Sequence, residues 1–276
     1  MADVDQKLTD LIGFSREAFD TAQTAQGWSS RLQWVLAVIA VVAVFLPGQE
    51  LAIVAAGLSL VGAAAIACLR FRQQGFRRYG ERVRRATLLA KGLGHELSAH
   101  EYQSIEATFG GDRKRATAKA DTNYYASRLP PGEDRLIENL YESAFWSADL
   151  FKYSARTAWV RFAGLAFAAI LVIVTIVPFL SEDLDIILSR IFLVVMTVLV
   201  SREVLGDAFN YSMAQHEVCL VLERLEALKG KPNKTADLML ILGDYNAAVE
   251  AAPIPQTGVY ERRKQNITDS WDKART

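Results

Sequence analysis

The string His95-Glu96-Leu97-Ser98-Ala99-His100 is the one place where this sequence suggests a metal site. The helix of a zinc protease carries histidines at positions i and i+4, so that both reach one ion from the same face. Here the histidines stand at i and i+5, which turns them about 140° from each other on a helix. We therefore expect no metal at this string.

The signatures of common catalytic sites are also missing from the sequence. There is no glycine-rich phosphate loop after a strand and no G-x-S-x-G elbow. A nucleophile outside such a motif stays possible, but no residue pattern points to one. We therefore expect a protein that is not an enzyme and that carries no cofactor.

Binding of an anion is one chemistry that residue types in the middle of the chain allow. Arg128 and Arg135 lie close in sequence to Tyr124, Tyr125 and Trp146. Arginine forks suit phosphate and aromatic faces suit bases, so these residues could bind an anionic nucleotide. The alternative is that Trp146 packs helix against helix while the arginines face water or anionic lipid.

The distribution of apolar residues indicates a membrane protein. Hydrophobic residues make up 51% of the chain and the mean hydropathy is +0.12. A helix over Leu51–Leu69 would reach about 28 Å, close to the roughly 30 Å of a hydrocarbon core. The alternative is four buried core helices in a soluble protein. The apolar runs are Leu32–Leu46, Leu51–Leu69, Phe162–Leu180 and Ile186–Val200.

Charges at the ends of these runs predict their orientation. A dense group of arginines directly follows the second run, whereas the short turns Pro47–Glu50 and Ser181–Asp185 carry acids and no base. Cationic flanks stay in the cytoplasm. We therefore expect a multi-pass membrane protein with both termini in the cytoplasm. The arginines are Arg70, Arg72, Arg77, Arg78, Arg82, Arg84 and Arg85.

The predicted fold is an all-α membrane protein with four transmembrane helices arranged as two hairpins, each followed by a long cytoplasmic helical stalk. We expect an amphipathic helix over 1–30 that packs on the protein through Leu8, Leu11, Ile12 and Phe19. The first hairpin spans 31–70 and the first cytoplasmic segment 71–160, with its stalk continuing to about Thr108. The second hairpin spans 161–202 and the last cytoplasmic segment 203–276. The two halves resemble a parallel duplication.

Polar and small residues inside the runs are candidates for helix packing or for a pore. Small residues at every fourth position let helices approach closely, within one protomer or between protomers. Arg190 could snorkel outward to the acidic turn or act at the mouth of a pore. The hydroxyls are explained equally well by bonds back to carbonyls. The candidates are Ala55, Ser59, Ala63, Thr175, Ser189, Arg190 and Thr197.

The block before the third run resembles the SMODS-associated four-transmembrane family. The resemblance lies in Asp121–Pro130, Arg135, Glu138–Leu140, Glu142–Trp146 and Leu150, and in the ending Pro253-x-Pro255…Tyr260…Trp271. It implies a pore-forming effector of a bacterial anti-phage defence system. A nucleotidyltransferase would make a cyclic nucleotide on infection, and the effector would then permeabilise the inner membrane.

The expected partners are the lipid bilayer, further copies of the same chain and that cyclic nucleotide, with no DNA among them. Four helices form a filled bundle, so a pore would need several protomers. A non-conducting membrane scaffold for soluble partners, and a constitutive channel or transporter, remain the alternatives.

Overall fold

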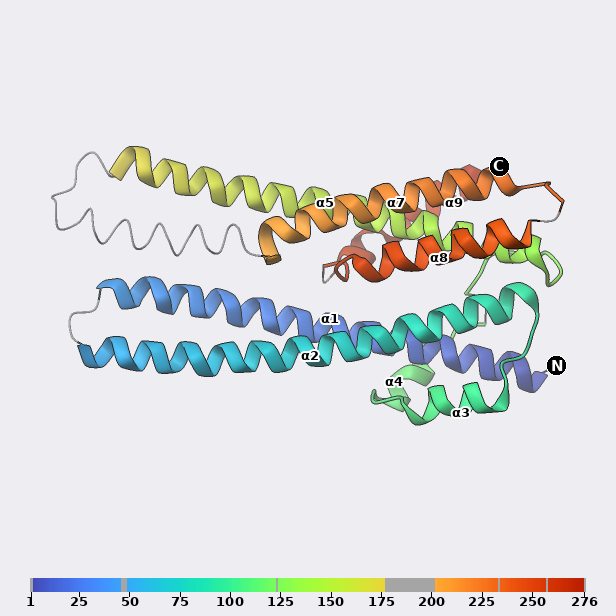
Figure 1. Ribbon diagram of the computed structural model, residues 1–276, viewed down its shortest axis with the longest axis horizontal. Helices are drawn as coiled ribbons and strands as arrows, with labels where there is room; N and C mark the ends of the chain where they lie inside the picture. The colour runs from blue at the N-terminus through green and yellow to red at the C-terminus, as the bar shows by residue number, and fades with distance from the viewer. Residues whose placement is uncertain are drawn as a thin grey trace.

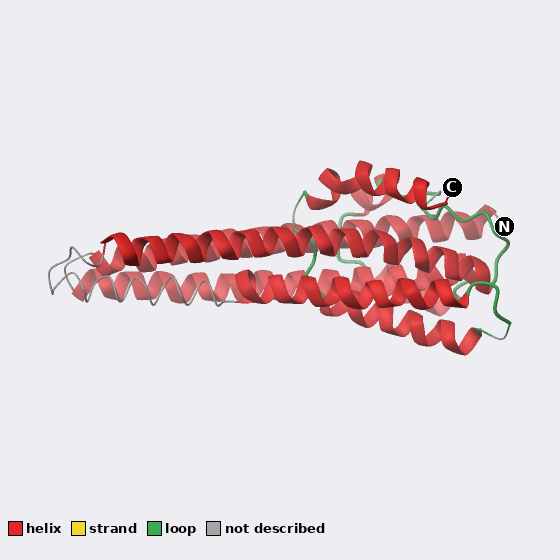
Figure 2. Ribbon diagram, turned by 90° about the horizontal axis from the view of Figure 1, so that it is seen from above, coloured by secondary structure: helices red, strands yellow, loops and turns green. Residues whose placement is uncertain are grey.

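The computed structural model describes residues 2–45, 49–122, 124–176, 202–232, 234–256 and 258–275 of the protein. These residues form helices joined by short connections, and no strand occurs among them. The predicted all-α class is therefore confirmed for this part of the chain. Figures 1 and 2 show long helices that project well beyond the part of the molecule where the short helices gather.

The first hairpin consists of α1 (Ala2–Phe45) and α2 (Gln49–Leu93), which run antiparallel side by side (Figure 1). Helix α1 is continuous, so the predicted boundary between an N-terminal helix and the first span does not interrupt it. Leu8, Leu11 and Ile12 are buried, as predicted for an N-terminal stripe that packs on the protein. The amphipathic start of α1 therefore belongs to a hydrophobic core of the protein.

The second hairpin pairs α5 (Glu133–Ile176) with α7 (Asp207–Leu228), and a π-helical turn, Arg202–Gly206, precedes α7. Helix α7 ends at Leu228, and Gly230 follows with a φ of 74°, a left-handed conformation that favours glycine. Two further helices follow, α8 (Thr235–Ala251) and α9 (Val259–Arg275). Both termini lie at the end of the molecule opposite the end of α1 and the start of α2 (Figure 1).

The described residues form two hydrophobic cores. The first core joins α1 and α2 to α3 (Ala99–Ala107) and α4 (Arg113–Ala118) through Leu11, Val83, Ile105 and Ala116. The second joins α5, α7 and α8 through side chains such as Leu140, which is fully buried, and it also includes Leu88 of α2. Helix α2 therefore contributes to both cores, and short helices complete each of them. The proposed duplication stays a prediction.

The first stalk is shorter than the sequence predicts. Helix α2 ends at Leu93, and Gly94 follows with a φ of 73°, a left-handed conformation that favours glycine. The chain then begins α3, whose N-cap Ser98 accepts a hydrogen bond from the backbone nitrogen of Glu101 at 3.1 Å. The stalk predicted to reach Thr108 is therefore two helices, because Gly94 ends the first and Ser98 begins the second.

The contact face of α2 also differs from the predicted stripe of small residues. Between positions 53 and 75 the inward residues alternate in steps of four and three, a coiled-coil period that keeps one face toward the partner helix. Ala55 and Ser59 lie on this face, but Ala63 is exposed and Gly62 is buried in its place. A strict step of four drifts about 40° per repeat, so it leaves the contact face. The inward positions are Ala55, Ser59, Gly62, Ile66, Leu69 and Gln73.

One helix of the described chain, over Ile53–Leu93, is long and apolar enough to cross a membrane by length and composition. Only 6% of its most apolar window is buried inside the protein. The structure therefore supports one span, and four spans stay a prediction. Thr175 lies in the last turn of α5, while Ser189, Arg190 and Thr197 lie outside the described residues.

Gly92 sets the distance between the two hairpins. A Cβ atom at this position would lie 2.9 Å from the Cα atom of Leu136 on α5, and the Gly132 amide donates to the Gly92 carbonyl at 2.9 Å. We predict that Gly92→Ala lowers the free energy of unfolding by about 1–3 kcal/mol, because α2 and α5 must move apart.

Thermal unfolding in detergent, followed by circular dichroism, measures this effect. Gly75→Ala on the same helix is the control, since nothing lies within 4 Å of its added Cβ atom. The control should be neutral or stabilising. Equal melting temperatures for the two variants would contradict close packing at Gly92.

Candidate functional site at the junction of the two hairpins

Two of the predicted ligand-binding residues, Tyr124 and Tyr125, contact each other, and their side chains pack inside the protein. Their rings meet edge to face at 4.8 Å, and Tyr125 is 6% exposed. Burial raises the pKa of Tyr125 well above its ordinary value. The guanidinium over the Tyr124 ring, at 5.5 Å, belongs to Arg16 of α1. The two tyrosines therefore pack between the hairpins.

The remaining predicted residues are spread over other surroundings. Arg128 is exposed, and Arg135 has a buried Nε atom without a hydrogen-bond partner in the described chain. Trp146 packs against Tyr260 of α9 with ring centroids 6.1 Å apart. The helix-packing interpretation of Trp146 thus agrees with the geometry, and the structure does not gather these residues around one cavity.

The loop that carries the tyrosines is fixed to α5 by two glutamates. Glu142 accepts a hydrogen bond from the Ala126 amide at 2.9 Å, and Glu138 accepts one from the Ser127 hydroxyl. These glutamates are part of the motif quoted for the family resemblance. Their role here is to hold the connection between the two hairpins in one conformation.

Arg84 of α2 is a largely buried charge between the hairpins. Its side chain is 11% exposed and pairs with Glu81 at 2.8 Å, while it donates to Asn246 of α8 at 3.0 Å. Its guanidinium lies 4.9 Å from the ring centroid of Tyr245. Burial acts to lower the pKa of Arg84, but Tyr245 and Glu81 outweigh it and raise that pKa. The charge is therefore held permanently at this interface.

Neighbouring arginines of α2 extend this attachment along the helix. Arg85 pairs with Glu250 of α8 at 3.2 Å, and Arg82 pairs with Glu101 of α3 at 2.9 Å. Arg77 donates to the carbonyl of Val249 at 2.8 Å and to that of Ala252. Those carbonyls end α8, where a helix leaves acceptors unpaired and carries partial negative charge. Some of the α2 arginines that were used to predict the membrane orientation therefore join the two hairpins.

An extended segment, Pro253–Gln256, follows α8 and is bound by both hairpins. Gln23 of α1 donates to the carbonyl of Pro255 at 2.8 Å. Tyr211 of α7, fully buried, donates to the carbonyl of Ile254 at 2.6 Å. The segment therefore links the first hairpin to the second, next to the point where the apolar parts of the long helices begin.

Two adjoining cavities lie at this junction. One, the polar chamber, has a volume of about 380 Å³ and is lined by Arg31, Arg70, Arg77, Arg161 and Asp207, among others. The other, the apolar chamber, has a volume of about 570 Å³ and includes Val160, Leu165 and Val204 in its wall. Both volumes fall in the range of small-molecule sites, roughly 300–1,000 Å³. Ser30, Trp34, Arg161 and Gln256 line both chambers.

Unpaired polar atoms mark the wall of the polar chamber. Ser29 is 2% exposed, and its Oγ atom has no hydrogen-bond partner among the described residues. The Oε1 atoms of Gln26 and Gln256 are likewise buried and without a partner there. Buried polar atoms are normally satisfied, so such a group indicates a ligand or bound water. We take the junction with its two chambers as the candidate functional site.

The sequence contained a signal for this site, but we interpreted that signal as marking the ends of the predicted hairpins. Arg31, Arg70 and Arg161 mark the ends of the apolar runs, which gave the boundaries of the predicted hairpins. Each lies where a long helix leaves its apolar part, so an arrangement of hairpins side by side brings the three together. What the sequence could not show is the contribution of Gln256, which arrives from the C-terminal segment.

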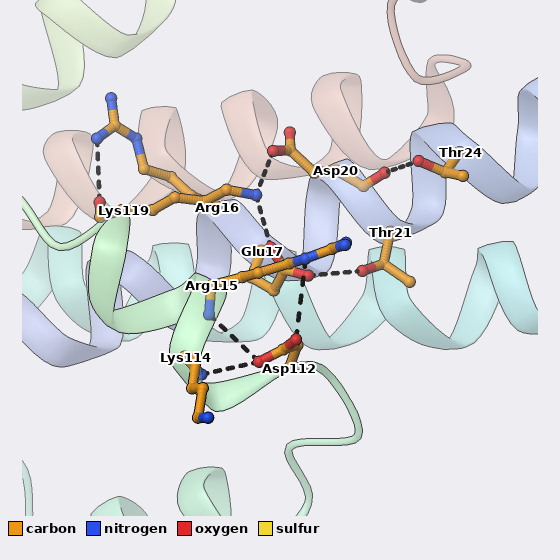
Figure 3. A network of polar contacts seen from close by, with 9 residues as sticks. All are labelled: Arg16, Glu17, Asp20, Thr21, Thr24, Asp112, Lys114, Arg115 and Lys119. Atoms are coloured by element: carbon orange, nitrogen blue, oxygen red, sulfur yellow. Dashed lines mark hydrogen bonds and ion pairs between the residues drawn. The ribbon is translucent and has the colours of Figure 1, made fainter.

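A second polar network attaches α4 to α1 away from the junction (Figure 3). Glu17 of α1 is 2% exposed and pairs with Lys119 at 2.6 Å, and Lys119 also contacts Asp20. Burial acts to lower the pKa of Lys119, but its hydrogen bonds to Asp20 and Glu17 raise it. Asp112 caps α4 by accepting from the Lys114 amide at 2.9 Å. Since its charges are paired, this network holds the fold together.

Three comparisons with known proteins found no match to this chain. The chain matches no protein-family model, no curated protein and no solved structure. The resemblance drawn from the motif residues therefore stays a prediction. The structure does bring the two parts of that motif together, because Phe145 lies 5.3 Å from Trp271 and Trp146 lies 6.1 Å from Tyr260.

Substitution of Arg84 tests whether its buried ion pair contributes more to the free energy of unfolding than an exposed ion pair made by the same helix. Arg84→Met leaves Glu81, 6% exposed, without its cation, and we expect a loss of about 3–5 kcal/mol in the free energy of unfolding. Arg85→Met is the matched control, because its pair with Glu250 is about 40% exposed and such pairs contribute about 1 kcal/mol or less. Chemical unfolding in detergent measures both, and equal losses would show that Arg84 does not hold the interface.

Proposed function

We propose that this protein is an integral membrane protein whose long helices cross the bilayer as two hairpins. The observation that carries the proposal is the apolar surface of the projecting helix ends. Trp34, Val38, Leu60, Phe167 and Ile170 are between 44% and 74% exposed. Soluble monomers rarely expose apolar surface of this extent, whereas lipid covers it without cost.

The border of this surface lies at one level on three helices. Arg31 of α1, Arg70 of α2 and Arg161 of α5 all line the polar chamber, and the exposed apolar residues extend from there toward the ends of the hairpins. Basic residues at such a border favour the cytoplasmic side. The proposal therefore places the parts of α1, α2, α5 and α7 that carry the hydrophobic cores inside the bacterial cell. The short helices and both termini lie there as well.

We further propose that the protein acts as a pore-forming effector of a bacterial anti-phage system. The resemblance of the motif residues supports this function, and so does the division of the long helices into an exposed apolar part and a part that packs with the short helices. Two hairpins of one chain pack around a filled core, so water must cross between protomers of a homo-oligomer. The extended segment Pro253–Gln256, attached to both hairpins, offers a physical link from cytoplasmic bundle to membrane.

Activation in this proposal means that a signal changes how the two hairpins meet. A cyclic nucleotide from a nearby nucleotidyltransferase is the signal that the resemblance suggests. The contact through Arg84, Arg85 and Arg77 is the element that such a signal would shift, because it is polar and connects separate cores. A ligand acts only through a difference in affinity between two arrangements.

Lysine substitutions test the membrane location directly. Leu60 of α2 is 74% exposed and Leu240 of α8 is 63% exposed. We predict that Leu60→Lys lowers the membrane-inserted fraction, because a lysine at mid-bilayer costs about 3 kcal/mol, whereas Leu240→Lys changes nothing. Flotation of membranes after alkaline extraction measures the inserted fraction. A water-soluble bundle would tolerate both substitutions, so equal behaviour would refute the proposed spans.

Measurement of the membrane potential in cells tests the proposed pore. We expect cells that express the chain together with a cyclic-oligonucleotide-producing nucleotidyltransferase to depolarise within minutes, as read by a potential-sensitive dye. Cells with the Leu60→Lys variant should stay polarised. A non-conducting scaffold gives no depolarisation and retains a soluble partner on purification. A constitutive channel depolarises cells without the nucleotidyltransferase.

A further inference from the structure

We propose that the junction binds one phospholipid, with its phosphate in the polar chamber and the start of its acyl chains in the apolar chamber. The inference rests on the membrane location proposed above and is independent of pore formation. The juxtaposition that carries it is a cluster of arginines and unpaired buried polar atoms beside an apolar cavity, at the level where the apolar surface begins.

The shape of the site fits an amphipathic ligand. The two chambers adjoin through Ser30, Trp34 and Arg161, and their linings differ in polarity. Val160, Leu165 and Val204 belong to the apolar chamber alone, while Arg31 and Arg70 belong to the polar chamber alone. A free phosphate or a small polar metabolite would use only one of these two spaces.

The charges of the polar chamber fit a phosphate. The guanidinium of Arg31 lies over the Trp28 ring at 5.2 Å, and Arg31, Arg70 and Arg161 are exposed to solvent. Arginine presents a planar set of donors that matches phosphate oxygens. Arg77 contributes charge, although it also donates to the end of α8, and Asp207 is the one acid in the lining. Basic residues therefore outnumber acids in the chamber.

The unpaired atoms specify more of the headgroup. The Ser29 hydroxyl can donate to a phosphate oxygen, while the Oε1 atoms of Gln26 and Gln256 are acceptors. A headgroup that carries an ammonium or hydroxyl group beside its phosphate satisfies these acceptors. Phosphoethanolamine and phosphoglycerol headgroups both meet this requirement, and an anion without a donor does not.

The position of the aromatic side chains agrees with a lipid at this depth. Trp28 and Trp34 are 57% and 44% exposed, and Trp159 donates to Ser212 of α7 at 3.2 Å. Tryptophan favours the interface between headgroups and hydrocarbon. A lipid phosphate is held at this same level, so a lipid can enter the junction without leaving the bilayer.

A lipid bound here would join the two hairpins. Arg31 and Arg70 belong to α1 and α2, Arg161 belongs to α5, and Gln256 belongs to the extended segment. One phosphate would thus interact with cations from both hairpins at once. Its presence would hold the junction closed around the extended segment.

Native mass spectrometry of the full-length protein in detergent tests the proposal. Phosphatidylethanolamine or phosphatidylglycerol is added in one arm, and inorganic phosphate or glycerol phosphate in the other. We expect one retained phospholipid per protomer, about tenfold weaker retention in Arg161→Gln and in Ser29→Ala, and no adduct with the soluble phosphates.

Arg72→Gln is the matched control. Arg72 is exposed on α2 near Arg70 and stacks over Phe76 at 5.7 Å, but it does not line either chamber. It shares any general attraction to anionic lipid, so retention should be unchanged. Circular dichroism of each variant shows whether it is folded.

Three results would overturn the inference. They are equal retention by Arg161→Gln and Arg72→Gln, no retained phospholipid in the wild type, and binding of soluble phosphate as tight as that of lipid. A chain that fails to float with membranes refutes the proposed membrane location instead. A chain that retains lipid but does not depolarise cells refutes only the proposed pore.

Discussion

The attachment of α2 to α8 through arginines is the interaction on which the rest of the structure depends. Apolar contact between the hairpins runs through Leu88 of α2, which belongs to the core of α5, α7 and α8. Arg84 adds a polar contact of defined geometry, because it is largely buried between Glu81, Asn246 and Tyr245, where a displaced charge would lose these partners. Arg77 adds a second fixed point at the end of α8. The close approach of Gly92 to Leu136 then sets the spacing of the helices.

This attachment explains why the junction is polar and partly unsatisfied. With α8 held against α2, the extended segment Pro253–Gln256 is forced between the hairpins just where their apolar parts begin. Its backbone is satisfied by Gln23 and Tyr211, but its side chain Gln256 is left with an unpaired oxygen. A site that connects both hairpins, and that lies at the membrane border in the proposed arrangement, is well placed to sense either lipid or a change in the packing of the two hairpins. In the proposed effector, this is the position from which a signal could reach the spans.

The sequence predicted the helices well and the contacts between them poorly. Long helices were expected around the apolar runs, and α1, α2 and α5 are each continuous helices. The N-terminal stripe of Leu8 and Leu11 was expected to pack on the protein, and it does. The first stalk was predicted to run past Gly94, since a glycine in a helical pattern can be either tolerated or terminal. The stripe of small residues on α2 was given the wrong period, because packing against α1 selects steps of four and three. Tyr124 and Tyr125 were interpreted as ligand-binding, whereas in the fold they lie between Arg16 and the core.

The amino-acid sequence by itself determined the all-α class, the lengths of the apolar runs and the basic residues at their ends. These are local properties of hydropathy and helical period, and they do not depend on which helix lies next to which. The tertiary structure alone decided that the arginines of α2 bind α3 and α8. It also decided that Arg31, Arg70, Arg161 and Gln256 line one cavity. The physical reason is that partners such as Arg84 and Asn246 are far apart in the chain, and only packing of the two hairpins brings their charges and dipoles within bonding distance.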